Sequence, residues 1–157
     1  MAIYIKFSGI DGEADIINHE KWTEIRSFNI GVHKPTSEKS DNKNQSISTK
    51  FHDIQLTKNT DRSSPLLYSA CALGKPFDKV NVHYVTTTKS GPHAITKYEL
   101  NRVFITMFEQ ETTGDRPIDR MTLRYMTIMY TQVPVNSEGV PGPTTEFAWV
   151  IDDGGVG

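Results

Sequence analysis

Apolar and polar residues alternate along much of this chain, with the period of two that is typical of half-buried β-strands. The first example is residues 3–7, where Ile3, Ile5 and Phe7 occupy one face and more polar side chains the other. Similar stretches predict further strands over residues 22–30, 47–58, 80–87, 95–110, 120–133 and 145–151. Many short strands separated by turns are typical of a β-barrel or a β-sandwich, so the chain is expected to be mainly β.

One short stretch departs from this alternation and predicts the single α-helix, over about residues 65–73. Ser64 is expected to be the N-cap, because its hydroxyl can accept a hydrogen bond from an unpaired backbone N–H. Pro65 suits the first helical position, and Gly74 suits the end, where a left-handed φ costs glycine little. A broad apolar face is expected to hold this short helix against the β-structure. Its residues are Leu66, Leu67, Ala70, Cys71 and Leu73.

Two long polar stretches predict loops. The first, from Lys34 to Ser46, contains no apolar side chain except that of Pro35. Loops of this length inside compact domains are often functional. A solvated connection between strands is an equally good interpretation of the same residues. The second stretch, residues 134–143, contains three prolines and two glycines.

The composition is that of a soluble protein with one domain. The 157 residues carry a net charge of −2 and suffice for one core, so a single domain is expected over residues 1–157. No cluster of Lys and Arg accompanies stacking aromatics, so nucleic acid is not an expected partner. No long apolar run predicts membrane insertion, and the N-terminus lacks the pattern of a secretory signal peptide. The single cysteine, Cys71, excludes an intrachain disulfide and is expected to be a buried packing residue.

No arrangement of residues predicts a catalytic or metal site. The five histidines are scattered without metal-ligand spacing, and there is no second cysteine. No glycine-rich phosphate loop follows a strand, and no nucleophile elbow is present. We therefore expect no enzymatic activity, no metal and no cofactor, with the histidines at ordinary surface or packing positions. This favours an assembly or binding protein over an enzyme.

Several short motifs follow one another along the chain. The opening strand and its turn are Ile3-Tyr4-Ile5-Lys6-Phe7 and Ile10-Asp11-Gly12-Glu13, and the second strand contains Trp22-Thr23-Glu24-Ile25 and Phe28-Asn29-Ile30-Gly31. The strand before the helix is Phe51-His52-Asp53-Ile54-Gln55-Leu56-Thr57-Lys58. The aromatic closing strand contains Glu146-Phe147-Ala148-Trp149. The most specific pieces are residues 61–67 and 70–77, around the helix. In this order and spacing the motifs resemble the haemolysin-coregulated protein (Hcp) family, the tube subunits of type VI secretion systems, over nearly the whole chain.

The resemblance implies a fold, an assembly and a set of partners. The implied fold is a β-barrel of two sheets flanked by one helix. Family members form homohexameric rings that stack into an inner tube, and the lumen can hold effector proteins. A contractile sheath drives the tube and its spike protein out of the cell. The protein would then be cytoplasmic before firing and extracellular afterwards, without a signal peptide.

The resemblance also gives the long loop a role. By analogy with the extended loop of the family, residues 34–46 would reach the next ring or subunit. The candidate contact residues are Lys34, Glu38, Lys39, Asp41, Lys43 and Asn44.

Two alternative functions stay open from the sequence. A tail-tube subunit of a contractile phage shares the architecture of the type VI tube. A monomeric β-barrel that binds a small ligand in its interior belongs to a different class. Its lipocalin form expects an N-terminal Gly-x-Trp, which neither Trp22 nor Trp149 provides.

Overall fold

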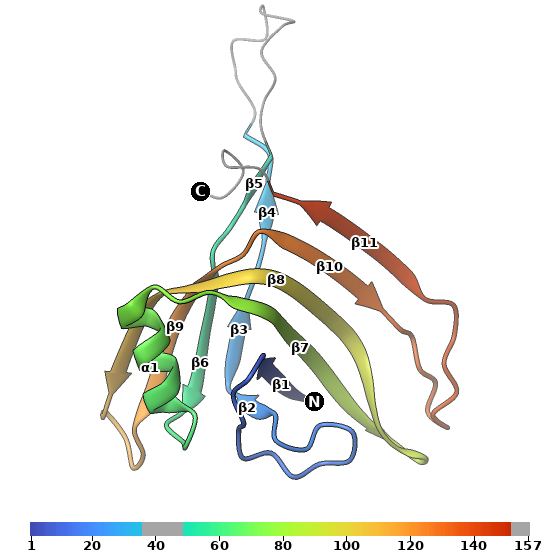
Figure 1. Ribbon diagram of the computed structural model, residues 1–157. Helices are drawn as coiled ribbons and strands as arrows, with labels where there is room; N and C mark the ends of the chain where they lie inside the picture. The colour runs from blue at the N-terminus through green and yellow to red at the C-terminus, as the bar shows by residue number, and fades with distance from the viewer. Residues whose placement is uncertain (36–48, 152–157) are drawn as a thin grey trace, which may run out of the picture.

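The protein is mainly β with one helix, as the sequence predicts, and the computed structural model describes residues 1–35 and 49–151 (Figure 1). The helix α1 spans Ser64–Leu73. The strands are β1 (Ala2–Phe7), β2 (Thr23–Ile25), β3 (Ser27–Asn29), β4 (Val32–His33), β5 (Lys50–Phe51), β6 (Ile54–Asn59), β7 (Phe77–Thr88), β8 (Gly91–Glu111), β9 (Ile118–Arg124), β10 (Thr127–Gln132) and β11 (Thr145–Val150). Within the described ranges, no helix is long and apolar enough to span a membrane.

The strands roll up into the barrel that the resemblance implies. Seven of them follow one another in the order β2-β1-β7-β8-β9-β6-β3. The two ends of this order, β2 and β3, are separated in the sequence only by Arg26, whose N–H donates to the Thr57 carbonyl of β6 at 2.7 Å. This short connection closes the barrel. β10 and β11 extend the sheet beyond the barrel beside β8, and β4 and β5 form a separate two-stranded ladder.

The long strand β8 belongs to both sheets of the barrel, one that contains β7 and one that contains β9. It pairs with β7 as far as Val103 and with β9 from Phe104 onward. Between these two segments Arg102 has a φ of 51°, which lies outside the β region and interrupts the pleat. Uniform alternation over residues 95–110 predicts that Leu100 and Val103 face opposite sides of the strand. That prediction is wrong, since both side chains are fully buried.

Three predicted strands are interrupted where the chain changes its pairing partner. Residues 22–30 form β2 and β3, which pair with β1 and β6 respectively. Residues 47–58 contain β5 and β6, and residues 120–133 contain β9 and β10. At the last of these breaks Tyr125 is fully buried, and its hydroxyl donates to the His52 carbonyl at 3.2 Å. The alternation of polar and apolar residues is typical of strands on both sides of each break. The sequence pattern alone therefore does not reveal where the break lies.

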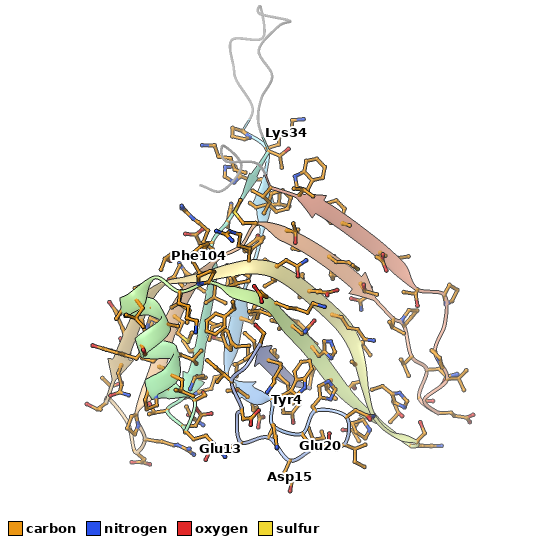
Figure 2. All side chains as sticks on the ribbon, in the orientation of Figure 1. Tyr4, Glu13, Asp15, Glu20, Lys34 and Phe104 are labelled. Atoms are coloured by element: carbon orange, nitrogen blue, oxygen red, sulfur yellow. The ribbon has the colours of Figure 1, made fainter. Side chains whose placement is uncertain are left out.

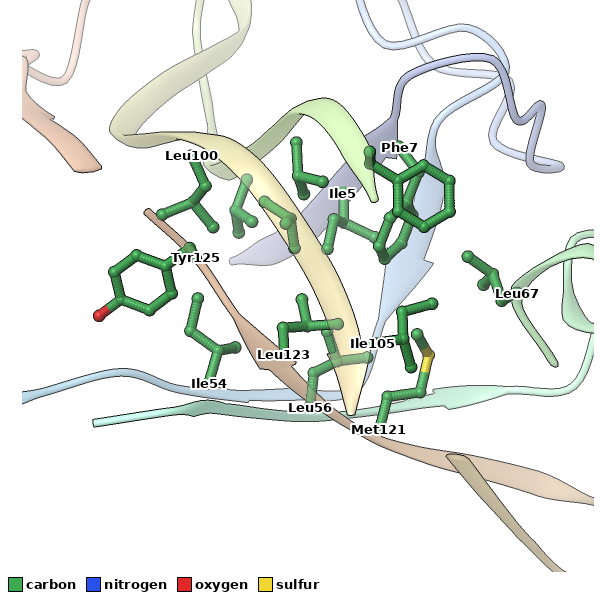
Figure 3. Packing of buried hydrophobic residues seen from close by; sticks show 14 of the residues in the cluster. Ile5, Phe7, Ile54, Leu56, Leu67, Leu100, Ile105, Met121, Leu123 and Tyr125 are labelled. Carbon is green, nitrogen blue, oxygen red and sulfur yellow. The ribbon is translucent and has the colours of Figure 1, made fainter. Parts of the chain in front are cut away.

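The barrel interior is filled by apolar side chains from both sheets and from α1 (Figure 3). Small barrels are commonly filled in this way and leave no channel. The fully buried members of this core include Ile5, Ile54, Leu56, Leu67, Val80, Leu100, Met121 and Leu123. The core therefore depends on contacts between strands that are distant in the sequence.

α1 ends as the sequence predicts but begins differently. Gly74 adopts a left-handed conformation with a φ of 65°, and its N–H donates to the Cys71 carbonyl at 3.2 Å. Pro65 lies in the first turn, as expected. The prediction that Ser64 is the N-cap is wrong, because the N-cap is Ser63, which makes no side-chain cap hydrogen bond. Ser64 is instead the first helical residue and is buried.

The apolar face of α1 is narrower than the sequence predicts. Leu67 and Ala70 are buried against the barrel, with Leu67 inaccessible to solvent. Leu66 and Leu73 are 54% and 76% exposed, so the prediction that they help to hold the helix is wrong. Cys71 is half-buried at the edge of the core. The helix is therefore held by one stripe and presents apolar side chains to solvent on another.

A buried polar network replaces the expected cap. Lys58 of β6 is fully buried, and its Nζ lies 2.9 Å from carboxylate oxygens of both Asp61 and Asp119. The Ser64 hydroxyl accepts hydrogen bonds from Lys58 Nζ at 2.9 Å and from the Asp61 N–H at 3.0 Å. It donates to Asp119, which also accepts from the Thr60 hydroxyl at 2.8 Å. The network joins the start of α1 to β6 and β9.

The charges in this network compensate one another. Burial alone would raise the pKa of Asp119. Hydrogen bonds from Ser64, Lys58 and Thr60 outweigh burial and hold the pKa below its usual value. The carboxylate is therefore ionised at neutral pH beside the Lys58 ammonium. Loss of one partner would leave an uncompensated charge inside the protein, which is the costly case for a buried pair.

A buried histidine anchors the segment between β1 and β2. His19 is 5% exposed, and its Nε2 lies 2.9 Å from Nδ1 of His83 on β7. Its ring stacks on Tyr4 and meets Trp22 edge-on, at centroid distances of 5.5 and 4.7 Å. Burial lowers the pKa of His19 and lowers the pKa of His83 to about 4, with smaller contributions at His83 from His19 and Lys97. Both rings are therefore neutral at pH 7 and serve in packing.

Leu67→Ala should lower the free energy of unfolding by about 2–5 kcal/mol, because it leaves a cavity beneath α1. Leu66→Ala is the matched control on the exposed side of the same turn and should change stability by roughly 0.5 kcal/mol or less. Urea denaturation followed by circular dichroism measures both. Equal effects of the two variants would contradict the packing of α1 described above.

Asp119→Ala should destabilise the protein by about 3–5 kcal/mol, because it removes a partner of the buried Lys58 ammonium. The control is Glu99→Ala, which removes a partner of Lys79 in a solvent-accessible pair 2.8 Å long. An exposed pair contributes only about 0–1 kcal/mol. If denaturation gave the two variants the same midpoint, the network would not hold the helix as we infer.

The histidine pair should make the protein less stable in mild acid. Because the pKa of His83 is about 4 in the folded state and about 6.5 in the unfolded state, the unfolded chain binds more protons between these values. Stability from this site should therefore be present above pH 6.5 and be lost progressively down to about pH 4. His83→Gln should show a shallower loss when denaturation midpoints are compared between pH 7 and pH 4.5. A slope identical to that of the parent would contradict this assignment.

Candidate assembly surfaces

Lys34 is the only one of the six candidate contact residues that lies within the described part of the chain. It is exposed and directly follows β4, whose ladder with β5 brings Val32 opposite Phe51. Figure 2 shows Lys34 at one end of the molecule. The segment between β1 and β2 lies at the opposite end and carries the exposed carboxylates of Glu13, Asp15 and Glu20. The other five candidates, Glu38, Lys39, Asp41, Lys43 and Asn44, lie outside the described residues.

Two histidines meet beside Lys34, an arrangement that the sequence does not predict. His33 Nδ1 lies 2.6 Å from His52 Nε2, and both side chains are exposed. The His52 N–H donates to the Gly31 carbonyl at 2.8 Å and so fixes its position. Among residues 1–35 and 49–151, no group of three or more His, Cys, Asp and Glu side chains could hold a metal ion. The pairing brings together residues on separate strands, so local spacing gives no sign of it.

A serine and a histidine also meet, at the turn between β7 and β8. Ser90 Oγ lies 2.8 Å from His93 Nε2 and 3.2 Å from Thr88 Oγ1. A catalytic serine requires a histidine that is itself oriented by a third group. In the part of the chain that the structure describes, no carboxylate is hydrogen-bonded to His93. The contact is therefore a hydrogen-bonded turn.

β10 and β11 form a wing that projects beyond the barrel (Figure 1). β11 pairs only with β10, so its other edge is unpaired within the described sheet, and all six of its residues are exposed. Phe147 and Trp149 are 44% and 45% exposed, and the register places them opposite Tyr130 and Ile128 of β10. The sequence correctly assigns Phe147 and Trp149 to one face of the last strand. We call the face formed by Tyr130, Phe147 and Trp149 the aromatic wing.

The aromatic wing is ordered by contacts among its own rings. Phe147 and Trp149 stack with centroids 6.0 Å apart and an interplanar angle of 14°. Tyr130 stacks on Tyr98 of β8 at 4.8 Å and 9°. Burial, with smaller contributions from neighbouring tyrosines, raises the pKa of Tyr98 to about 12, so its hydroxyl stays neutral. The result is a pre-formed apolar face that remains open to solvent.

A second exposed apolar surface lies on α1. A groove of about 380 Å³ runs between the helix and the turn that follows β1. We call it the helix groove. Its lining includes Leu66, Ser69, Ala70 and Leu73 from the helix, Ile10 from the turn, and Lys75, Pro76, Phe77 and Asp78 after the helix. Exposed apolar surfaces of this kind mark candidate contacts with other protein surfaces.

Comparison with known proteins identifies a family. A family model described as "Type VI secretion system effector, Hcp" matches residues 4–132. The chain is also similar in fold to a solved type six secretion system protein, with a TM-score of 0.84 and 24% identity over 95% of this chain and 94% of that one. No match is found among curated proteins.

Two further structures have the same fold. One is a type VI secretion system effector from Yersinia pestis, with a TM-score of 0.74 and 19% identity over 95% of this chain and 99% of that one. The other is Hcp1 from Salmonella typhimurium, with a TM-score of 0.74 and 20% identity over 95% and 93%. Because the family model matches residues 4–132, which are most of the sequence, the chain belongs to the Hcp family of type VI secretion systems.

Proposed function

We propose that this protein is a structural subunit of a type VI secretion inner tube, and that it acts by assembling into hexameric rings that stack. Membership of the Hcp family supports this role. The observation that carries the proposal is the exposed aromatic wing, since a strand whose six residues are all exposed is expected to acquire a partner. The partner in this proposal is another copy of the same chain.

A closed ring would explain why the single subunit has an exposed aromatic wing. An unpaired edge strand with exposed aromatic residues tends to associate without limit. A head-to-tail contact between identical subunits forms a closed ring when the rotation closes, and an open fibre when it does not. Closure into a ring would bury every wing and leave no free copy of this surface.

Stacking of rings would use the two ends of the subunit. Lys34 at one end and the carboxylates of Glu13, Asp15 and Glu20 at the other carry opposite charge, which favours a head-to-tail stack. The contact loop would contribute Glu38, Lys39, Asp41, Lys43 and Asn44 to the same junction. In this proposal the sheath surrounds the tube, the spike protein caps it, and effector proteins occupy its lumen. The subunit itself is not an enzyme and leaves the cell with the tube.

The packed interior favours this function over a monomeric barrel for small ligands. Ile5, Leu56 and Leu100 are fully buried in the space that such a ligand would need. A tail-tube subunit of a contractile phage shares the proposed assembly. The neighbouring genes distinguish that function from type VI secretion.

Gel filtration coupled to light scattering should give a mass six times that of the monomer, and negative-stain images at high concentration should show rings and tubes. Deletion of the gene should abolish export of the other secreted proteins of the system. A protein that stayed monomeric and formed no rings, from a gene whose deletion left secretion intact, would contradict the proposal.

A further inference from the structure

The ladder of β4 and β5 brings two histidines onto one face. The register places His33 opposite Lys50, and His52 follows two residues after Lys50. In an antiparallel ladder such residues are diagonal neighbours whose side chains stand on the same side. His33 Nδ1 and His52 Nε2 converge to 2.6 Å, with ring centroids 4.8 Å apart and an interplanar angle of 70°. Because both side chains are exposed, the two nitrogens face each other at the surface.

The backbone of His52 is held from two directions. Its N–H donates to the Gly31 carbonyl at 2.8 Å, and its carbonyl accepts from the hydroxyl of the fully buried Tyr125 at 3.2 Å. The imidazole lies over Gly31, where a Cβ would stand 3.5 Å from Nδ1. Phe51, which precedes His52, is buried in the core. Donor atoms on a fixed backbone bind a ligand with little loss of conformational freedom.

We infer that His33 Nδ1 and His52 Nε2 form a binding site for a divalent transition-metal ion such as Cu²⁺, Ni²⁺ or Zn²⁺. Imidazole nitrogen is a preferred ligand of all three ions. Two nitrogens that share a metal each lie about 2.0–2.1 Å from it and so stand about 3 Å apart. Small rotations of the exposed rings open the 2.6 Å separation to that distance. Both ligands belong to one subunit, so the inference does not depend on the proposed ring.

Metal binding at this pair needs only a change of tautomer. A neutral imidazole carries its proton on one ring nitrogen and binds a metal through the other. In the hydrogen bond between the two rings, one of the facing nitrogens carries the proton. When the metal takes the place of this proton, the proton moves to the outer nitrogen of the same ring. Water fills the remaining positions around the metal, because the pair is exposed.

The neighbouring charges select transition metals against Ca²⁺ and Mg²⁺. Lys34 follows His33 in the sequence, and Lys50 lies opposite it. The carboxylate that follows the pair in the sequence, that of Asp53, lies 3.6 Å from Arg124 Nε. Ca²⁺ and Mg²⁺ require oxygen ligands, chiefly carboxylates. Two neutral nitrogens beside two lysines do not supply these ligands, whereas Cu²⁺, Ni²⁺ and Zn²⁺ bind to the nitrogens themselves.

A bound metal would reinforce a short ladder. β4 and β5 share two residue pairs, Val32 with Phe51 and His33 with Lys50. A metal that joins His33 to His52 adds a third connection between the same two segments. Because a ligand of the folded state stabilises that state, the metal should raise the resistance of this part of the chain to local opening.

Isothermal titration calorimetry of the purified, untagged chain with ZnCl₂ and with NiCl₂ tests the site. We expect one ion to bind per subunit and neither CaCl₂ nor MgCl₂ to bind. Loss of an outer-shell partner alone weakens metal binding by about 10–100-fold. His33→Gln and His52→Gln each remove a ligand itself, so each variant should weaken the binding by at least as much.

His93→Gln is the matched control, because the ring of His93 pairs with Ser90 and not with a second histidine. It should bind both metals as the parent does, and all three variants should keep the parent's circular dichroism spectrum. Binding that persists in both His33→Gln and His52→Gln would overturn the inference. Equal loss in His93→Gln, or a parent that binds neither metal at millimolar concentration, would overturn it as well.

Nuclear magnetic resonance of isotope-labelled histidine rings gives an independent measurement. Addition of ZnCl₂ should shift the resonances of His33 Nδ1 and His52 Nε2 and leave the ring protons on the two outer nitrogens. The resonances of the buried His19 and its partner His83 should stay unchanged. Shifts at His19 and His83 without change at His33 and His52 would contradict the assignment, and so would spectra in which no ring responded.

Discussion

The buried contact between Lys58 and the carboxylates of Asp61 and Asp119 fixes the place of the only helix in the described structure. A helix of ten residues has little stability of its own, and only one narrow stripe of α1 packs on the barrel. The network ties the first turn of the helix to two strands through Ser64. With its N-terminus held by polar contacts, the helix can leave Leu66 and Leu73 on the surface. The network that holds the helix in place therefore also allows the helix groove to stay open to solvent.

The second constraint is the change of direction in β8. With Arg102 out of the β region, the first half of the strand lies beside β7 and β10 while the second half lies beside β9. The first half supports the sheet that continues into β11, and the second half helps to close the barrel. One strand thus links the packed core to a projecting wing. The wing carries aromatic residues that a closed monomeric barrel does not need, which is why we interpret the molecule as a component of an assembly.

The sequence predicted those features that depend on local chemistry. The alternation of side chains located the strands, and Gly74 marked the end of the helix because a left-handed residue is required there. The strand breaks and the fully buried Lys58 depend on contacts between distant segments, which no local pattern contains. Ser64 had the chemistry of an N-cap, yet a buried lysine and carboxylate used its hydroxyl instead. The exposure of Leu66 and of the wing could not be predicted, because apolar residues on a core face and on an interface look the same in one sequence.

The most direct test of this account is electron cryo-microscopy of the particles that the purified protein forms. The account predicts stacked six-fold rings in which a neighbouring subunit covers the exposed aromatic wing, so that Phe147 and Trp149 are buried. Rings in which Phe147 and Trp149 faced solvent would contradict the role that we propose for the aromatic wing. Particles without rotational symmetry would contradict the assembly itself.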